Sequence, residues 1–301
     1  MLSKFSPKAV IHIFDKDTIS HLRIPFSVYL FPIYLFSLSM AKNINWASAI
    51  IIFICLHLFI YPGSNSYNSY MDKDEGSIGG LKKPPPATRK IYFASIIFDI
   101  FGLLLSLFIG FDLFLAVLIY ITVSKLYSWD KSRLKKYGIL SWMVVLIFQG
   151  GYTYFLVNYF SSPGNQGWFN NYNISAMLIA SLFVGAYYPL SQIYQHKEDI
   201  KRGDKTISSM LGIKGTFILS FLLFAGVNIL LLLFFISFYN IFYYFLFFLF
   251  LSPVATYFIK WMNDSIKDSR NANYDRTMKM NTISAFCMSA CFLIMMIASN
   301  L

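Results

Sequence analysis

Carboxamides and carboxylates are concentrated in Asn65-Ser-Tyr-Asn68-Ser-Tyr-Met-Asp72-Lys-Asp74-Glu75-Gly76, which follows an apolar run that ends near Tyr61. Asn68 and Asp72 are four residues apart, so their side chains share one face if this stretch is helical. The same face leads back through Tyr61 to His57. Polar side chains along one face of an apolar helix need polar surroundings, which other segments of the chain must provide.

The composition indicates a membrane protein. The 301 residues are 57% hydrophobic and only 13% charged, and the mean hydropathy is +0.57. Apolar segments of about 20 residues with almost no charge are typical of membrane-spanning helices. We therefore predict an all-α integral membrane protein with nine transmembrane helices that enclose a central cavity open near the cytoplasmic face. The predicted segments are 21–40, 44–62, 90–109, 111–127, 138–160, 174–194, 215–238, 241–260 and 278–300.

The basic residues fix the expected orientation. The N-terminal segment and the loops after the second, fourth, sixth and eighth helices hold 24 of the 25 Lys and Arg residues. The positive-inside rule places these parts in the cytoplasm and the C-terminus outside. This asymmetry also accounts for the net charge of +11, so we expect no nucleic-acid partner. The expected location is a bacterial inner membrane, as a multi-pass protein.

We expect residues 1–301 to form a single transmembrane domain. Its first part, residues 1–20, is either a cytoplasmic segment lying flat in the membrane interface or a disordered tail. The three cysteines all lie in apolar runs without a CxxC spacing, which indicates neither a disulfide framework nor a zinc site.

A second polar segment follows the sixth helix. Gln195 and Asp199 are four residues apart, Glu198 lies close to the same face, and lysines and arginines follow. Magnesium is usually held by one or two carboxylates while substrate phosphates complete its shell. Two such sets on one side of the membrane predict a site where bridging Mg²⁺ holds a diphosphate. An acidic loop taken alone is more often simply solvated.

A third polar segment, Lys125 to Lys136, follows the fourth helix and includes Lys131 and Arg133. It is either an ordinary cytoplasmic flank or a second set of cations for the diphosphate. The residues do not decide between these interpretations.

The chain resembles the UbiA superfamily of intramembrane prenyltransferases in helix count, orientation and the order of its cytoplasmic motifs. The family's first motif, NDxxD with a further Asp, is similar to this chain at Asn68 and Asp72. Ser69 stands where the motif has an Asp, and Gly76 stands where the further Asp would fall. Asp74 and Glu75 are candidates to replace that ligand.

The family's second motif, DxxxD followed by a glycine and Lys-Thr, resembles the segment that begins at Gln195. Gln195 stands in place of the first Asp, and Glu198 is the candidate replacement. The resemblance implies that the metal ligands are Asn68, Asp72, Asp74, Glu75, Gln195, Glu198 and Asp199, with Asn68, Asp72 and Asp199 essential for catalysis. It also implies that the diphosphate is bound by Lys83, Arg133, Lys131, Arg202, Lys205, Arg23 and Tyr127.

The resemblance implies a reaction. An isoprenyl diphosphate is ionised with Mg²⁺, and its prenyl group passes to a lipophilic acceptor such as an aromatic or quinone precursor. A terpene cyclase, in which the substrate's own double bond traps the cation, is a close alternative. A transporter of a lipid or an anion is a more distant one, because the polar residues gather at one face and no repeat is visible.

Two further positions leave alternatives open. Asp99 lies inside the third apolar segment, where it is either a base for the acceptor or a structural hydrogen-bonding group, for example with Asn228 or Gln149. His57 is expected to serve helix packing more than proton transfer. A third acidic pair, Asp264 and Asp268, is expected to be solvated.

Overall fold

The computed structural model describes residues 13–162, 164 and 167–299. The chain divides into two compact units, and each is described by itself. The first comprises Met1–Ser27 and Ile50–Leu134, and the second comprises Val28–Ala49 and Lys135–Leu301. Most of the expected interfacial segment, residues 1–12, lies outside the described residues.

The first unit is built from helices. A peptide chain in lipid must satisfy its backbone hydrogen bonds internally, which long apolar segments achieve by forming helices. The helices are α2 (Lys16–Leu22), the start of η1 (Ile24–Leu30), the end of α4 (Trp46–Phe53), η2 (Ile54–Ile60), α5 (Tyr61–Asp72), α6 (Arg89–Ser106) and α7 (Phe111–Ser128).

Residues Trp46–Asp72 form one long helix whose winding changes along its length. Ile54–Ile60 is a π-helix, which has more residues per turn than the α-helix on either side. The stripe that we expected to connect Asp72 with His57 therefore does not keep the α-helical spacing. His57 is buried, stacks on Phe53 at 4.8 Å and meets Tyr61 edge-on at 5.1 Å, which agrees with a packing role.

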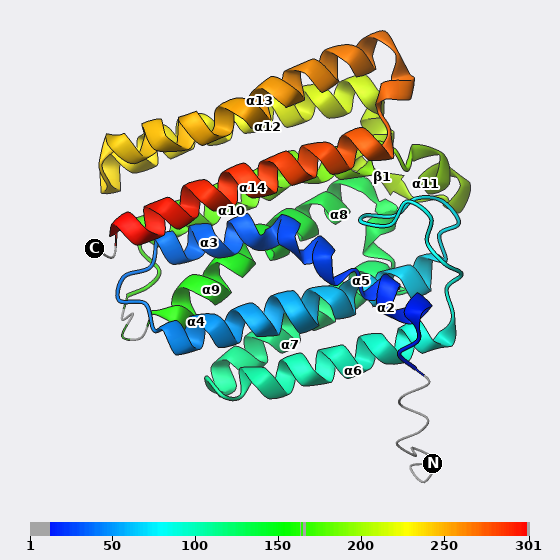
Figure 1. The fold of residues 1–301 in the computed structure, drawn as a ribbon, viewed down its shortest axis with the longest axis horizontal. Coiled ribbons are helices and arrows are strands. Elements are labelled where there is room, and N and C mark those ends of the chain that lie inside the picture. Colours follow the sequence, from blue (N-terminus) through cyan, green and yellow to red (C-terminus); the bar gives the residue numbers. More distant parts are fainter. Residues whose placement is uncertain (1–12, 163, 165–166, 300–301) are drawn as a thin grey trace. The chain divides into compact units, whose positions relative to one another are not determined.

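Helices α5, α6 and α7 pack against one another within the first unit (Figure 1). Small residues allow the close approach of α6. A Cβ atom on Gly63 would lie 2.7 Å from Oδ1 of Asp99, and one on Gly102 would lie 2.3 Å from the Ile60 side chain. The helix α5 ends at Asp72 because Lys73 adopts a left-handed conformation, and the N–H group of Lys73 caps the carbonyl of Ser69.

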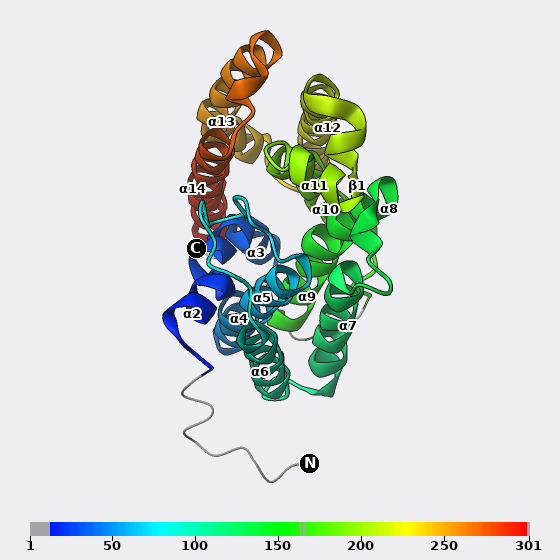
Figure 2. The same cartoon turned by 90° about the vertical axis from the view of Figure 1, so that its right-hand side faces the viewer.

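The second unit is also helical. Figure 2 shows α10 beside α12 and α13 beside α14. The unit contains α3 (Phe31–Ser39), α8 (Gly138–Val145), η4 (Leu146–Tyr152), α9 (Thr153–Ser161), α10 (Asn171–Gln192), α11 (His196–Arg202), β1 (Lys205–Thr206), α12 (Ile207–Phe238), α13 (Ile241–Lys267), η5 (Ser269–Asn271) and α14 (Tyr274–Ser299). The short 3-10 helix η3 (Leu134–Lys136) falls on the boundary with the first unit.

Large aromatic side chains fill the second unit. Phe217 and Trp261 are almost completely buried, and their rings meet edge-on at 4.9 Å. The π-helix η4 approaches α10 closely, because a Cβ on Gly150 would lie 2.5 Å from the Cα atom of Ser181. Asn240 caps α13 through the N–H group of Phe242, so the turn between the predicted segments 215–238 and 241–260 lies where the sequence predicts it.

Each predicted apolar segment falls on helices, but the count of nine spans is not confirmed. Eight helices in the described part of the chain are long and apolar enough to cross a membrane. The helix that is missing from these eight is α6, which has 18 residues and carries Arg89, Lys90 and Asp99. The protein is thus an all-α membrane protein, as predicted.

Candidate functional site

Asn68 and Asp72 lie on one face of α5, as their spacing predicts, and this face meets α7 within the first unit. Three polar contacts join the two segments. The hydroxyls of Ser64 and Ser124 lie 2.7 Å apart, and the Ser128 hydroxyl donates to Oδ1 of Asn68 at 2.9 Å.

The third contact lies beyond the end of α7, where Nη2 of Arg133 is 3.6 Å from Oδ1 of Asp72. These contacts follow the helical repeat along α5, so we call them the α5–α7 polar ladder. It comprises the pairs Ser64–Ser124, Asn68–Ser128 and Asp72–Arg133.

The third rung places a charge pair at the end of the ladder. The Asp72 side chain is only 5% exposed, and that of Arg133 is 17% exposed. Removing a carboxylate from water is unfavourable unless a cation compensates it. Arg133 is held in a left-handed backbone conformation (φ 35°), its N–H group donates to the carbonyl of Trp129, and Nη1 lies 3.4 Å from Asp130.

Arg23 organises the loop that follows α5. It caps α2 in a left-handed conformation and is buried. Its Nη2 group donates to the carbonyl of Asn65 at 2.8 Å, and its Nη1 group donates to that of Gly79 at 3.1 Å. The ring of Phe26 packs against the same loop, since a Cβ on Gly79 would lie 2.5 Å from it. Two backbone carbonyls thus engage a side chain that we predicted to bind the diphosphate, and that role stays a prediction.

The other predicted residues of the first unit lie in the loop after α5 or around the end of α7. Lys83, Lys131 and Glu75 are exposed, while Asp74 and Tyr127 are half-buried. The ammonium group of Lys131 lies 5.6 Å from the ring centre of Trp129.

One buried cluster was not foreseen. Nζ of Lys125 lies 2.7 Å from Oδ2 of Asp99, donates to the hydroxyl of Ser95, and stands 4.2 Å from the ring centre of Tyr67. Asp99 thus pairs with a lysine rather than with the amide groups that we had considered. We assigned Lys125 to the loop after the fourth predicted helix, but it lies inside α7. An Asp and a Lys in two neighbouring apolar segments were the available signal.

The second predicted motif lies in the second unit, on and after α11. The Thr206 hydroxyl donates to Oδ2 of Asp199 at 3.1 Å and also caps α12 by accepting from the N–H group of Ser209. Glu198 lies 3.6 Å from Arg202, which is one helical turn further on. Gln195 precedes the first turn of α11, and its carbonyl accepts from the N–H group of Asp199.

Two loop residues complete this motif. Gly203 ends α11 with a φ of 73°, a conformation that glycine adopts without strain. The side chain of the predicted diphosphate ligand Lys205 is exposed, while its backbone pairs in parallel with Tyr137. His196 begins the helix and bonds to Ser208 at 2.7 Å, and burial lowers the pKa of its imidazole.

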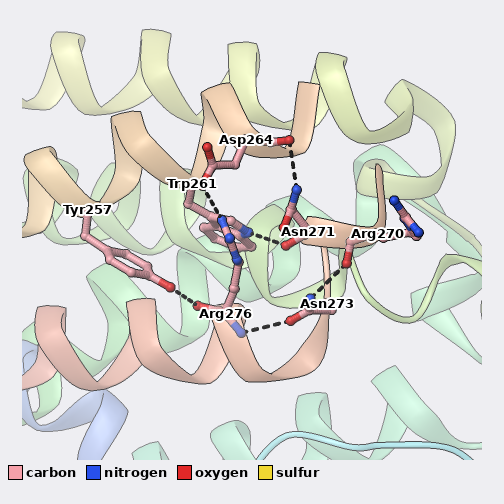
Figure 3. A network of polar contacts seen from close by, with 7 residues as sticks. All are labelled: Tyr257, Trp261, Asp264, Arg270, Asn271, Asn273 and Arg276. Carbon is pink, nitrogen blue, oxygen red and sulfur yellow. Dashed lines mark hydrogen bonds and ion pairs between the residues drawn. The ribbon is translucent and has the colours of Figure 1, made fainter. Parts of the chain in front are cut away.

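The last polar turn of the second unit is a closed network, shown in Figure 3. Asp264 pairs with Arg276 at 2.6 Å, and Trp261 donates to the carbonyl of Asn271 at 2.9 Å. Asp268 pairs with Arg270, and the hydrogen bonds from Arg270 hold the pKa of that carboxylate below its usual value. Both carboxylates keep contact with solvent, with side chains 32% and 39% exposed, and each is also paired with an arginine.

The donors suit a magnesium ion that substrate oxygens also ligate. Asn68 with Asp72, and Gln195 with Asp199, provide amide and carboxylate oxygens, the ligand types that Mg²⁺ prefers. No group of three or more His, Cys, Asp or Glu side chains in the described ranges is arranged to hold a metal ion by itself. Each motif therefore fits an ion whose shell the substrate completes.

Comparison with known proteins identifies the class. The model of the UbiA prenyltransferase family matches residues 29–283. The chain therefore belongs to the UbiA prenyltransferase family, and the resemblance noted in the sequence is confirmed. No curated protein matches the chain.

Solved structures share the fold. A UbiA homolog from Archaeoglobus fulgidus bound to GPP and Mg²⁺ is 17% identical, with a TM-score of 0.68 over 93% of this chain and 99% of the other. The apo structure of a UbiA homolog from Aeropyrum pernix K1 is 14% identical, with a TM-score of 0.66 over 92% and 99%. A structure of digeranylgeranylglyceryl phosphate synthase is 17% identical, with a TM-score of 0.58 over 94% of this chain and 97% of the other.

Proposed function

We propose that this protein is an intramembrane prenyltransferase that ionises an isoprenyl diphosphate with Mg²⁺ and transfers the prenyl group to a lipophilic acceptor. Membership in the UbiA prenyltransferase family supports the class of reaction. The observation that carries the proposal is the α5–α7 polar ladder, which places Asn68 and Asp72 on one helix face with Arg133 beside the carboxylate.

The ligands and cations have separate tasks. Asn68, Asp72 and Asp199 hold the metal, with Asp74, Glu75, Gln195 and Glu198 as further ligands. Magnesium, when bound, neutralises part of the charge on the diphosphate and so makes it a better leaving group. The diphosphate is bound by the side chains of Lys83, Arg133, Lys131, Arg202, Lys205, Arg23 and Tyr127.

Arg133 acts both on the metal ligand Asp72 and on the diphosphate. It compensates Asp72 across 3.6 Å, a distance longer than a hydrogen bond. Asp72 would hold the metal, and the guanidinium of Arg133 beside it would donate to the diphosphate, whose oxygens it matches in geometry.

The reaction balances without a redox partner. The bond between C1 of the prenyl chain and the diphosphate oxygen breaks, and the diphosphate leaves with the electron pair. The nucleophilic atom of the acceptor forms a bond to C1 and loses a proton to the departed diphosphate. The apolar helices keep water from the allylic cation, which would otherwise be hydrolysed.

The proposed setting is a cell membrane, with the N-terminus in the cytoplasm and the C-terminus outside, and a bacterial inner membrane is the proposed location. The charge distribution of the sequence supports this orientation. Eight helices of sufficient length and apolarity support the multi-pass location.

The test is a product analysis. Purified protein is incubated with geranylgeranyl or farnesyl diphosphate, Mg²⁺ and membrane extract, and the lipids are analysed by mass spectrometry. We expect a prenylated product that is absent with Asp72→Asn or Asp199→Asn and present with Asp268→Asn, which removes a carboxylate that pairs with Arg270 outside the two motifs. A terpene hydrocarbon or alcohol formed without extract would show a cyclase. No product and no diphosphate release would refute the proposal.

A further inference from the structure

The hydroxyl of Ser128 does not make the hydrogen bond that serine and threonine usually make inside helices. Such hydroxyls commonly donate to the carbonyl three or four residues earlier. Thr122 does so on the same helix, where its hydroxyl donates to Leu118. The Ser128 hydroxyl, 3% exposed at the last residue of α7, donates instead to Oδ1 of Asn68 on α5.

This contact selects one end of a carboxamide. The side chain of asparagine has an oxygen that accepts and a nitrogen that only donates, and the two ends exchange by rotation of the amide. Only the oxygen ligates a cation. An amide oxygen has two lone pairs, so it can accept from a hydroxyl and also ligate a cation. The hydroxyl of Ser128, which donates to Oδ1, resists the rotation that would present the nitrogen instead.

We propose that Ser128 is a positioning residue that orients the Asn68 carboxamide for metal binding. The inference rests on the proposed function, because it assumes that Asn68 is a ligand. The second unit contains a similar contact, in which the Thr206 hydroxyl donates to Asp199. Partners of this kind, which orient ligands without touching the metal, change metal affinity about 10- to 100-fold when removed.

The first rung of the ladder provides a matched control. Ser124 lies one helical turn before Ser128 and contacts Ser64, which is not among the proposed ligands. Ser124→Ala therefore removes a hydroxyl from the same interface without affecting a metal ligand. Ser128→Thr keeps the donor, while Ser128→Cys keeps most of the volume and has only a weak donor.

The experiment measures metal binding directly. Mn²⁺ is titrated into the detergent-solubilised full chain with an unreactive thiolodiphosphate analogue of geranyl diphosphate, and free Mn²⁺ is determined by electron paramagnetic resonance. We expect Ser128→Ala and Ser128→Cys to raise the Kd about 10-fold or more. Ser128→Thr and Ser124→Ala should stay within about twofold of the unmodified protein if only the donor matters.

The Asn68→Asp variant shows whether Ser128 orients the side chain at position 68 or only stabilises the helix interface. An aspartate has two equivalent oxygens, so Asn68→Asp removes the need to select an end. In that background Ser128→Ala should raise the Kd less than about threefold, whereas a merely structural role would give the same loss in both. Wild-type Mn²⁺ binding by Ser128→Ala and Ser128→Cys, with binding abolished by Asp72→Asn, would overturn this inference alone. Unchanged binding by Asp72→Asn would overturn the proposed function.

Discussion

Asp99→Asn should destabilise the protein by about 3 kcal/mol, because it leaves a buried lysine without its carboxylate. The two side chains are 7% and 17% exposed, and Nζ of Lys125 lies 2.7 Å from Oδ2 of Asp99. At that distance the gross attraction is about 6 kcal/mol for an effective dielectric constant of 20. Desolvation offsets much of it, and breaking a buried pair typically costs about 3–5 kcal/mol.

The lower end of this range applies because Lys125 keeps two other contacts. Its ammonium group still donates to Ser95 and still faces the ring of Tyr67. Lys125→Met leaves the carboxylate as the uncompensated charge and should cost at least as much. The double variant, which removes both charges, should lose only about 1 kcal/mol, since it leaves no uncompensated charge in the buried site.

The assay is unfolding in mixed micelles of dodecyl maltoside and sodium dodecyl sulfate, followed by circular dichroism, for the two single variants and the double variant. The difference between the double loss and the sum of the single losses gives the coupling energy, which we expect to exceed about 2 kcal/mol. Additive losses, or a loss below about 1 kcal/mol for Asp99→Asn, would refute the assignment of a stabilising buried pair. Folded Asp99→Asn should still release diphosphate, whereas loss of the reaction in stable protein would indicate a base instead.

Three further predictions concern packing, capping and pH. Gly63→Ala should lower the free energy of unfolding by about 1–3 kcal/mol, because its Cβ would press on Asp99. Gly226→Ala should be neutral or stabilising, because a Cβ there meets nothing within 4 Å. Thermal unfolding of both variants tests this, and equal effects would contradict it. Thr206→Val should cost about 1 kcal/mol through the lost cap of α12, with recovery in Thr206→Ser, as measured by the same unfolding. Burial lowers the pKa of His196, so the folded state binds its proton less readily than the unfolded state. Stability should therefore fall as the pH drops below about 6.5, and less so in His196→Gln; parallel pH profiles would exclude this histidine as the cause.

Local periodicity explains what the sequence could predict. Asn68 and Asp72 share a face because four residues make about one turn of an α-helix, and the structure has that helix. The turn before Asn240 follows from polar residues between two long apolar runs, and Asn240 does cap α13. Such features depend on neighbours in the chain and need no knowledge of how helices pack.

Contacts between distant segments explain what the sequence could not predict. Lys125 pairs with Asp99 because α7 packs beside α6, an arrangement that no local pattern encodes. The π-helix Ile54–Ile60 likewise interrupts the expected stripe to His57, although its composition is ordinary for an apolar helix. The sequence does not predict the contact between the Ser128 hydroxyl and Asn68, because serine is common at helix ends.

The proposed metal site can be tested by comparing rates of diphosphate release. Diphosphate release from geranylgeranyl diphosphate is measured for the unmodified protein and for Asp72→Asn, with Mg²⁺ and again with excess chelator. We expect release that requires Mg²⁺ and that falls at least about 100-fold in folded Asp72→Asn protein, because the site loses a charge that stabilises the transition state. Release that continues in the chelator, or that Asp72→Asn leaves intact, would contradict it.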